Sequence, residues 1–225
     1  GTWSYEFVQP MIQLKKAWQT PAEMIGFLDS QFIPVRNKIE EAKEQVVAAA
    51  VNTSIAKALS VCKAYNLLAL YTAATSDATV TDLTTFLTSK NAMKFANMFI
   101  SKTLKLMEKL SVNYNAEGYE TFTSRDDLIF EVAASYAKSS AFYLESDTFH
   151  KELVELPGYT EVPYWQYNKT GTDSELTSIY VQNDQIGADP ISQSGIVAFA
   201  HDIENIAAYF GDEYEWSVPN VRQRV

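Results

Sequence analysis

A helical pattern extends over residues 20–61 of the 225-residue sequence. Thr20 is a favourable N-cap residue, Pro21 follows at the first helical position, and Glu23 stands three residues after the cap. This order is typical of a helix start, because the Thr hydroxyl and the Glu carboxylate satisfy amides that have no partner within the helix. Pro34 interrupts the pattern, since a proline inside a helix removes one hydrogen bond and clashes with the preceding turn. We therefore predict a discontinuous helix, bent or broken near Pro34.

Helical spacing resumes after the proline and continues to Val61. The apolar residues stay near one stripe, formed by Ile39, Val46, Val47, Ala50, Ile55 and Leu59. Charged residues between them, such as Lys38 and Glu41, supply a solvated face. A helix this long and this rich in alanine can pack closely against its neighbours, and we predict that it is the spine of one domain.

The remaining segments show both strand and helix patterns. Alternation of apolar and polar residues predicts strands at residues 3–9 and 153–165, with a further extended piece at 11–18. Residues 127–133 also have a strand pattern, and the apolar run at 195–200 predicts a buried strand. Apolar residues at helical spacing predict helices at 91–110 and 135–144, the first with its lysines opposite an apolar face of Phe95, Met98, Phe99, Leu106 and Leu110. Residues 63–75 are ambiguous between the end of a helix and a strand, and their aromatic and leucine content favours a strand. Together these patterns predict an α+β fold.

Two segments near the C-terminus carry less regular patterns. Residues 166–194 are polar and punctuated by glycine and proline, which predicts a long irregular segment of the kind that is functional or mobile. The apolar pattern at residues 203–210 predicts a short helix or an extended run.

Composition excludes several classes of protein. A single cysteine, Cys62, rules out an internal disulfide framework and fits a reducing compartment. The formal charge of −10, from 28 acidic and 18 basic residues, argues against a non-specific grip on nucleic acid, which needs a basic surface. No apolar run approaches the roughly 18 residues that a membrane span requires. We expect a globular protein without a membrane partner, and if it meets DNA, one that encloses the DNA without coating it.

Residues that could carry chemistry are few. His150 and His201 have no partner histidine at ligand spacing, and the neighbouring pair of His201 and Asp202 indicates a structural histidine more than a catalytic one. Cys62 follows an apolar helix and is expected to be a small buried hydrophobe. Adjacent acids such as Asp126 and Asp127 are typical of solvated turns, and no phosphate loop or dinucleotide fingerprint is present. We predict no catalytic residue, no cofactor and no metal, and hence no enzyme.

Five segments follow one another in a recognisable order. They are TWSYEFVQPMIQLKKAWQTPAEMIGFLDSQF at residues 2–32, KAYNLLALYTAAT at 63–75, NYNAEGYETFTSRDDLIFEV at 113–132, YLESDTFHKELVELPGYTEVPYW at 143–165 and GIVAFAHD at 195–202. In this order and at this spacing they resemble the major capsid proteins of tailed bacteriophages, which have the Hong Kong 97-type fold. The similarity is to relatives from phages of Gram-positive hosts and gut bacteria, and it covers nearly the whole chain.

The resemblance implies a division of the chain into four parts. Residues 1–18 would be the returning strand of the extended loop, or E-loop, and residues 19–125 a peripheral domain that contains the spine helix. Residues 126–212 would form an axial domain, and residues 213–225 would return to the peripheral domain. Relatives have an N-terminal arm and an outgoing E-loop strand upstream of the matched segment. We therefore expect a partial E-loop and a chain that does not close a shell by itself.

The same resemblance implies a function. It predicts a structural subunit of an icosahedral phage capsid, which assembles with copies of itself into hexamers and pentamers that enclose the DNA genome without sequence-specific binding. Scaffolding and portal proteins are further expected partners, and assembly would take place in the host cytoplasm before the protein resides in the virion capsid. Trp3, Tyr5 and Phe7 lie on one side of an edge strand, which neighbouring subunits would have to cover, and we expect them to form a subunit contact.

Three other interpretations remain open from the sequence. An encapsulin-type compartment shell shares the fold, and purified particles would then hold cargo enzyme in place of DNA. A helical adaptor or regulatory module would bind its partner in the groove between two long helices and would be a monomer or dimer. An enzyme would have to use His201 and Asp202.

Overall fold

The structure, a computed structural model, describes residues 20–61, 63–115, 118–145, 156, 158–166, 171–182 and 189–210. The chain divides into two compact units, one of Glu44–Ile206 and one of Gly1–Lys43 with Ala207–Val225. The strand expected at residues 3–9, with Trp3, Tyr5 and Phe7, lies outside the described residues, as does the extended piece at 11–18. The division into parts at residues 18, 125 and 212 stays a prediction.

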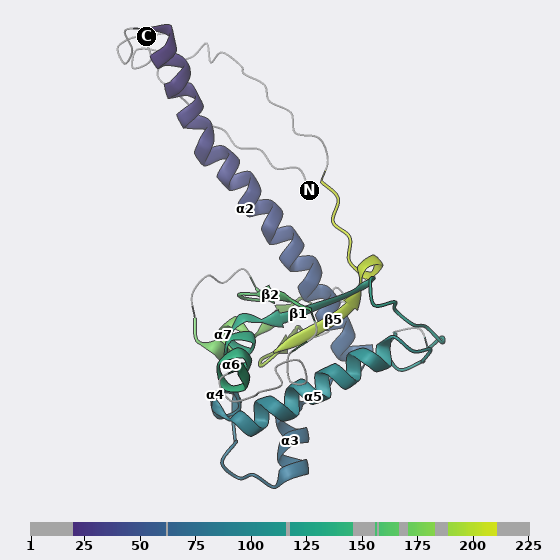
Figure 1. Cartoon of the computed structure of the whole chain (residues 1–225). Coiled ribbons are helices and arrows are strands. Elements are labelled where there is room, and N and C mark those ends of the chain that lie inside the picture. Colours follow the sequence, from purple (N-terminus) through teal and green to yellow (C-terminus); the bar gives the residue numbers. More distant parts are fainter. Residues whose placement is uncertain are drawn as a thin grey trace. The chain divides into compact units, whose positions relative to one another are not determined.

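Helix α2 spans Pro21–Val61 and begins as predicted (Figure 1). The Glu23 amide donates to the Thr20 hydroxyl at 3.3 Å, and the Thr20 amide donates to the Glu23 carboxylate at 3.2 Å. The expected break at Pro34 is wrong, because the α-helix runs through this residue without interruption. Pro34 and Ser30 are both exposed, so water can bond to the Ser30 carbonyl that lacks an amide partner.

The apolar stripe predicted along this helix is buried only near its C-terminal end. Ile55 and Ala56 are buried, with Val51 and Leu59 packed partly against them. Val46 and Val47 stay 39% and 42% exposed. Helical spacing identified the apolar residues of α2, but not which of them meet the core.

Helix α3 spans Leu67–Thr75, so the strand expected at residues 63–75 is wrong. The Asn66 side chain caps the helix by accepting a bond from the Ala69 amide at 2.9 Å. The hydroxyls of Thr72 and Thr75 donate to helix carbonyls four residues earlier, which lets these β-branched residues stay in a helix. The cap at Asn66 is a helix signal that outweighs the aromatic and leucine content of the segment.

Two further helices follow. Helix α4, Leu83–Thr88, was not expected, although its N-cap Asp82 forms a capping box with Thr85. Helix α5, Lys90–Met107, confirms the helix predicted at 91–110 and ends three residues earlier. Ser89 is the C-cap of α4 and the N-cap of α5, and its side chain accepts a bond from the Ala92 amide at 3.3 Å.

A three-stranded sheet with the order β2-β1-β5 lies beside these helices (Figure 1). Strand β1, Leu128–Ala133, and helix α6, Ala134–Glu145, confirm the strand and helix predicted at these positions. Strand β2, Thr160–Val162, pairs with β1 in parallel, and β5, Ala198–Asp202, pairs with β1 antiparallel. Of the strand predicted at 153–165, only Thr160–Val162 is strand among the described residues.

The segment expected to be irregular, residues 166–194, contains regular structure. It holds the short helix α7, Asp173–Leu176, and a two-stranded antiparallel sheet of β3, Ile179–Val181, and β4, Ile191–Gln193. The strand predicted at 195–200 begins only at Ala198, and its apolar residues are half-buried. After β5, the 3-10 helix η2 spans Ile203–Asn205, and the described residues beyond it have no regular structure.

Two apolar cores lie within the unit Glu44–Ile206, one on each face of the three-stranded sheet. Leu128, Phe130 and Val132 of β1 face the larger core, with buried residues from α3, α4, α5 and α6. The other core joins Ala133 of β1 to Trp165, β3 and the C-terminal part of α2. Strand alternation explains this arrangement, because successive side chains point to opposite faces of a sheet.

Candidate subunit interface

Helix α5 has one buried face and one exposed face. The buried residues are Ala92, Met93, Ala96, Asn97, Ile100 and Leu104. On the exposed face, residues at intervals of four form a row that continues past the helix end: Lys94, Met98, Lys102, Leu106 and Leu110. Such a row is a ridge on a helix surface, and we call these five residues the α5 ridge. Its apolar members are largely uncovered, with Met98 at 62% and Leu110 at 60% exposure.

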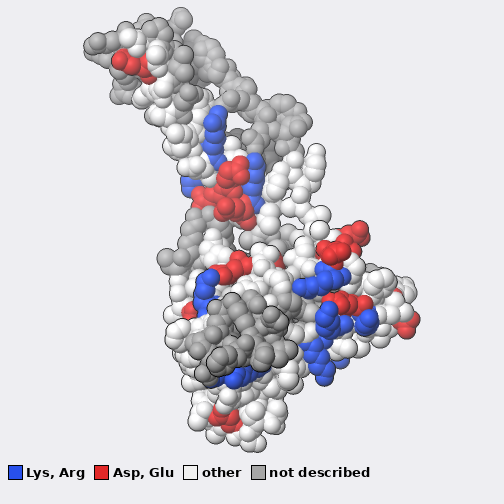
Figure 2. Space-filling model, in the orientation of Figure 1, with Lys and Arg blue, Asp and Glu red and all other residues white. Residues whose placement is uncertain are grey.

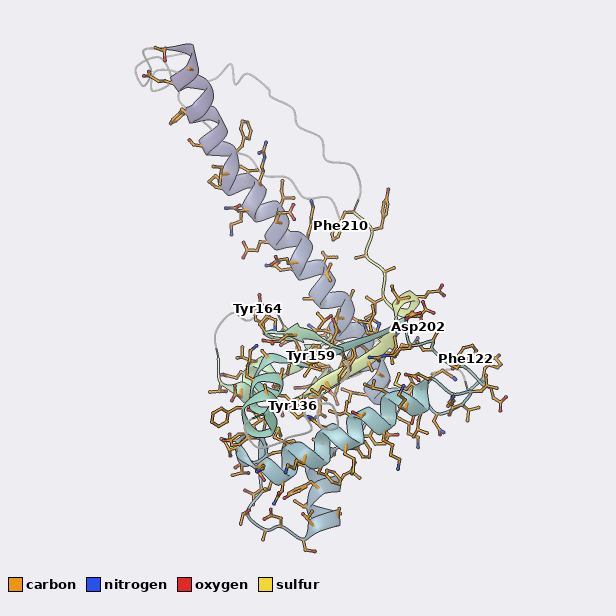
Figure 3. All side chains as sticks on the ribbon, in the orientation of Figure 1. Phe122, Tyr136, Tyr159, Tyr164, Asp202 and Phe210 are labelled. Atoms are coloured by element: carbon orange, nitrogen blue, oxygen red, sulfur yellow. The ribbon has the colours of Figure 1, made fainter. Side chains whose placement is uncertain are left out.

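The chain then forms a short two-stranded ribbon. The amides of Ser111 and Thr121 each donate to the carbonyl of the other, at 2.9 and 3.0 Å. Leu110, Val112, Glu120 and Phe122 flank this pair in the sequence, and all four are exposed. Val112 and Phe122 are 50% and 61% exposed, and Figure 3 shows Phe122 at the end of the molecule beyond α5. We call residues 110–112 and 120–122 the ribbon.

Side-chain hydrogen bonds hold the turn of the ribbon. The Asn115 side chain donates to the Tyr119 carbonyl and to the Thr121 hydroxyl, and it accepts a bond from the Gly118 amide at 2.6 Å. Gly118 has a φ of +74°, which residues with a Cβ rarely adopt. Asn115 and Gly118 therefore shape the described part of this turn.

The base of the ribbon is tied to α5. The Thr123 amide donates to the Met107 carbonyl at 3.1 Å. The ring of Tyr65 meets the ring of Phe99 edge-on at a centroid distance of 5.0 Å. Burial, together with the nearby Tyr65 hydroxyl, raises the pKa of Tyr114 to about 12. These contacts make the α5 ridge and the ribbon one continuous surface.

A buried polar network fixes α5 against α6. The Tyr136 hydroxyl donates to the Asn97 side-chain carbonyl at 2.6 Å, and the Asn97 amide group donates to the Ser140 hydroxyl at 2.8 Å. Burial raises the pKa of Tyr136 far above its usual range, so its hydroxyl stays protonated and can donate. All three residues are buried, and Figure 3 shows Tyr136 on the α6 side of α5. The network joins the buried face of α5 to α6.

Two neighbouring strands of the three-stranded sheet carry a pair of titratable side chains. Glu131 of β1 and His201 of β5 approach to 3.9 Å between Oε2 and Nε2, and this Glu131 oxygen accepts no hydrogen bond from any described residue. Burial raises the pKa of Glu131 above its usual range, and the nearby His201 imidazole partly offsets this rise. Glu131 therefore makes stability depend on pH.

Replacing Glu131 by glutamine is expected to stabilise the protein at pH 7.5. A raised pKa means that the folded state holds the proton more tightly than the unfolded chain. Stability is therefore lost as pH rises from the pKa of Glu131 in the unfolded chain through its pKa in the folded protein. Glutamine does not ionise, so the stability of the variant relative to the wild type should fall toward zero difference as pH falls to about 4. Thermal unfolding of Glu131→Gln and wild type at both pH values measures this.

The matched control is Glu161→Gln, which removes an exposed carboxylate bonded to Lys138 at 2.7 Å. It should leave the pH dependence of unfolding close to that of the wild type. A stabilisation by Glu131→Gln that is equal at both pH values would show that the buried charge is not its cause.

The residues considered for catalysis do not form a site among those described. The Nδ1–H of His201 donates to the backbone carbonyl of Asp202 at 2.8 Å, while the Asp202 carboxylate accepts a bond from the Glu204 amide. His201 and the acid of Asp202 thus have separate partners. Cys62 and His150 lie outside the described residues.

The described residues contain no group of three or more His, Cys, Asp or Glu that could hold a metal ion. An open depression between α3 and the turn at residues 76–81 is lined by small, polar and aliphatic side chains. No helix in the described ranges has the length and apolar character needed to cross a membrane. The exposed α5 ridge and ribbon are therefore the candidate functional surface of the described residues.

The sequence contained a signal for this surface that periodicity did not reveal. The alternation of Leu110, Ser111 and Val112, an Asn and Gly turn, and then Thr121 and Phe122 is a hairpin pattern. It is too short to predict a stable ribbon, because an isolated pair of strands is marginal without further support. The contacts to α5 and Tyr65 provide that support.

Comparison with known proteins identifies a family. The family model of the Phi29-like phage major capsid protein matches residues 3–220. Neither a search of curated proteins nor a search of solved structures gave a match. The family match supports a phage capsid over an encapsulin-type shell or a helical adaptor. Because it covers nearly the whole sequence, the chain belongs to the Phi29-like phage major capsid protein family and is a structural protein of the virion capsid.

Proposed function

We propose that this protein assembles into hexamers and pentamers, which form an icosahedral capsid around the DNA genome. The observation that carries the proposal is the family match over residues 3–220. A major capsid protein must repeat many times in one particle, and repeated copies are held by interfaces related by symmetry. The exposed α5 ridge and ribbon are a surface of the kind that such an interface covers.

The proposal includes the Hong Kong 97-type fold, with α2 as the spine helix. Residues 1–18 would be the returning strand of the E-loop, and Trp3, Tyr5 and Phe7 would contact a neighbouring subunit. Helix α2 supports the spine assignment through its length, Pro21–Val61. Scaffolding and portal proteins would be further partners, with assembly in the host cytoplasm.

The charge of the protein supports enclosure of DNA without binding to it. The formal charge is −10, and a polyanion is repelled by a surface of the same sign. We propose a role in containment, with no sequence recognition and no catalytic activity.

Electron microscopy of the concentrated protein tests the assembly. We expect rings of five and six copies, because heterologous contacts repeated around an axis close into rings. Analytical ultracentrifugation over a range of concentrations should show the corresponding species. A protein that stays a monomer or a two-fold dimer at every concentration would contradict the proposed assembly, and purified particles that hold cargo enzyme in place of DNA would contradict the genome-enclosing role.

A further inference from the structure

We propose that a proton on Glu131 controls how tightly the C-terminal part of α2, residues 51–61, packs on the three-stranded sheet. The contact is closed when Glu131 carries the proton and opens locally as pH rises. The inference goes beyond the proposed assembly and does not rest on it, because both elements belong to the single unit Glu44–Ile206.

Glu131 lies on the face of the sheet that α2 packs against. Its side chain points to the same face as Ala133, two residues further along β1, and it is paired across the ladder with Phe199 of β5. Ala133 and Phe199 both pack in the smaller core with Ile55 and Ala56 of α2. Figure 1 shows the C-terminal end of α2 passing β1 and β5. Glu131 is therefore flanked by the residues that hold α2 on the sheet.

Two buried oxygen atoms in this region accept no hydrogen bond from any described residue. One is Oε2 of Glu131, whose side chain is 16% exposed, and the other is Oδ1 of Asn52. Asn52 is 6% exposed and lies one helical turn before Ala56, on the same side of α2. A buried polar atom without a partner costs free energy that is recovered when water reaches it. Separation of α2 from the sheet would let water bond to both oxygen atoms.

His201 is the titratable group that faces Glu131 from β5. Its Nε2 lies 3.9 Å from Oε2 of Glu131. Its Nδ1–H donates to the backbone carbonyl of Asp202 at 2.8 Å, and its ring stacks on Phe199 at a centroid distance of 5.1 Å. These two contacts hold the imidazole beside the carboxyl group.

The other elements around Glu131 bring no charge to it among the described residues. The residue paired with it on β2 is the uncharged Thr160. Glu161, the next residue, points to the opposite face and bonds to Lys138 at 2.7 Å. On α2 the buried residues of the contact are uncharged and Lys57 is exposed, while β3 and β4 contribute aliphatic side chains to this core. The charge state of the contact thus depends on Glu131 and its histidine neighbour.

The direction of the pH effect follows from burial. Burial raises the pKa of Glu131, and the His201 imidazole offsets only part of this rise. The closed contact therefore holds the carboxyl proton more tightly than an open one, in which Glu131 meets water. Opening releases that proton, so it becomes more favourable as pH rises from the pKa of a hydrated carboxyl, about 4.3, to that of the buried one. Above the second value, opening no longer changes with pH.

Helix α2 is the element that separates from this face at the least cost. Among the described residues, one exposed hydrogen bond joins residues 44–61 to the rest of the unit, from Asn205 to Ser54 at 3.2 Å. Backbone bonds of 2.9 Å tie residues 196 and 197, on the other side of the same core, to Thr177 and to Ala133 of β1. A helix end that leaves its core frays, because isolated helices are marginal in water.

Hydrogen exchange of the full chain between about pH 4 and pH 8, followed by mass spectrometry, tests the inference. After correction for the intrinsic exchange rate, the protection of residues 51–61 should fall by up to ten-fold per pH unit above about pH 4.3 and then level off, since each opening releases one proton. In Glu131→Gln the protection of the same residues should be independent of pH. Equal pH dependence in the wild type and in Glu131→Gln would overturn the inference.

Low concentrations of urea distinguish a local opening from unfolding of the whole unit. A local opening exposes little surface, so exchange of residues 51–61 should change little with urea, whereas exchange of residues 92–104 of α5 should accelerate. Protection of residues 51–61 should also be at least ten-fold lower than that of residues 92–104. Equal protection and equal urea dependence in the two segments would show that α2 separates only when the unit unfolds, which contradicts the inference.

Two further variants check which group titrates. Glu161→Gln removes a carboxylate from the opposite face of the same sheet and should leave the pH dependence of residues 51–61 as in the wild type. His201→Gln removes the imidazole that offsets part of the rise, so the pH at which protection levels off should move upward. A loss of the pH dependence in Glu161→Gln, or an unchanged levelling pH in His201→Gln, would show that Glu131 is not the controlling group.

Discussion

Replacing Trp165 by alanine is expected to destabilise the unit Glu44–Ile206 by about 3–5 kcal/mol, the range for removal of a buried aromatic side chain. Trp165 is 2% exposed and packs in one core with Ile55 and Ile179. Its indole N–H donates to the Ile196 carbonyl at 2.7 Å, and its backbone amide donates to the Leu176 carbonyl at 3.2 Å. The substitution leaves a cavity and deprives a carbonyl of its donor.

Urea unfolding followed by circular dichroism measures the effect, and hydrogen exchange locates it. Exchange should accelerate most at residues 173–181 and 191–196, because Trp165 joins these two segments. Trp165→Phe keeps most of the ring and loses the N–H, so it should cost less, about 1–3 kcal/mol. Equal losses for the two variants would show that the hydrogen bond outweighs the packing.

Replacing Tyr136 by alanine is expected to cost about 3–5 kcal/mol as well. Tyr136 is fully buried in the larger core, and its hydroxyl donates to Asn97 within the network that holds α5 against α6. The variant loses both the ring and the donor. Because α5 carries the ridge, the same change should also weaken association beyond its effect on folding.

Two further variants divide this loss into its parts. Tyr136→Phe retains the ring and removes the donor, for an expected cost of about 1–3 kcal/mol. Ser140→Ala removes the other end of the network. The double variant Tyr136→Phe with Ser140→Ala should lose a free energy of unfolding that differs from the sum of the two single losses, since both substitutions act through Asn97. Tyr209→Ala, at a side chain 94% exposed, should change stability by less than about 0.5 kcal/mol. Strict additivity in the double variant would show that the two bonds act independently.

The sequence by itself determined the elements whose signals are local. The cap at Thr20 and Glu23 marks the start of α2, and helical periodicity identifies α5 and α6. Strand alternation identifies β1 because its two faces differ, with Leu128, Phe130 and Val132 on one side. The order of the segments was sufficient to indicate a phage major capsid protein, and the family match over residues 3–220 confirms this.

Tertiary contacts decided where a local signal was ambiguous. Residues 63–75 contain apolar and aromatic residues that suit a strand or a helix, and the Asn66 cap with burial of Tyr71 in the larger core selects the helix α3. The polar segment 166–194 is ordered in part as α7, β3 and β4, with Ile179 buried beside Trp165. Pro34 remains within α2 because the position is exposed and solvent can satisfy the freed carbonyl.

Only the tertiary structure decided which apolar residues remain uncovered. The spacing of apolar residues predicts that Met98 and Leu106 share one face of α5 with Phe95, opposite the lysines, and this is wrong, because Met98 and Leu106 are exposed in one row with Lys94 and Lys102. The buried face instead carries Asn97, which bonds to Tyr136 and Ser140 about forty positions away in the sequence. The ridge and the ribbon thus follow from contacts distant in sequence, whereas the helix that carries the ridge follows from the spacing of its own residues.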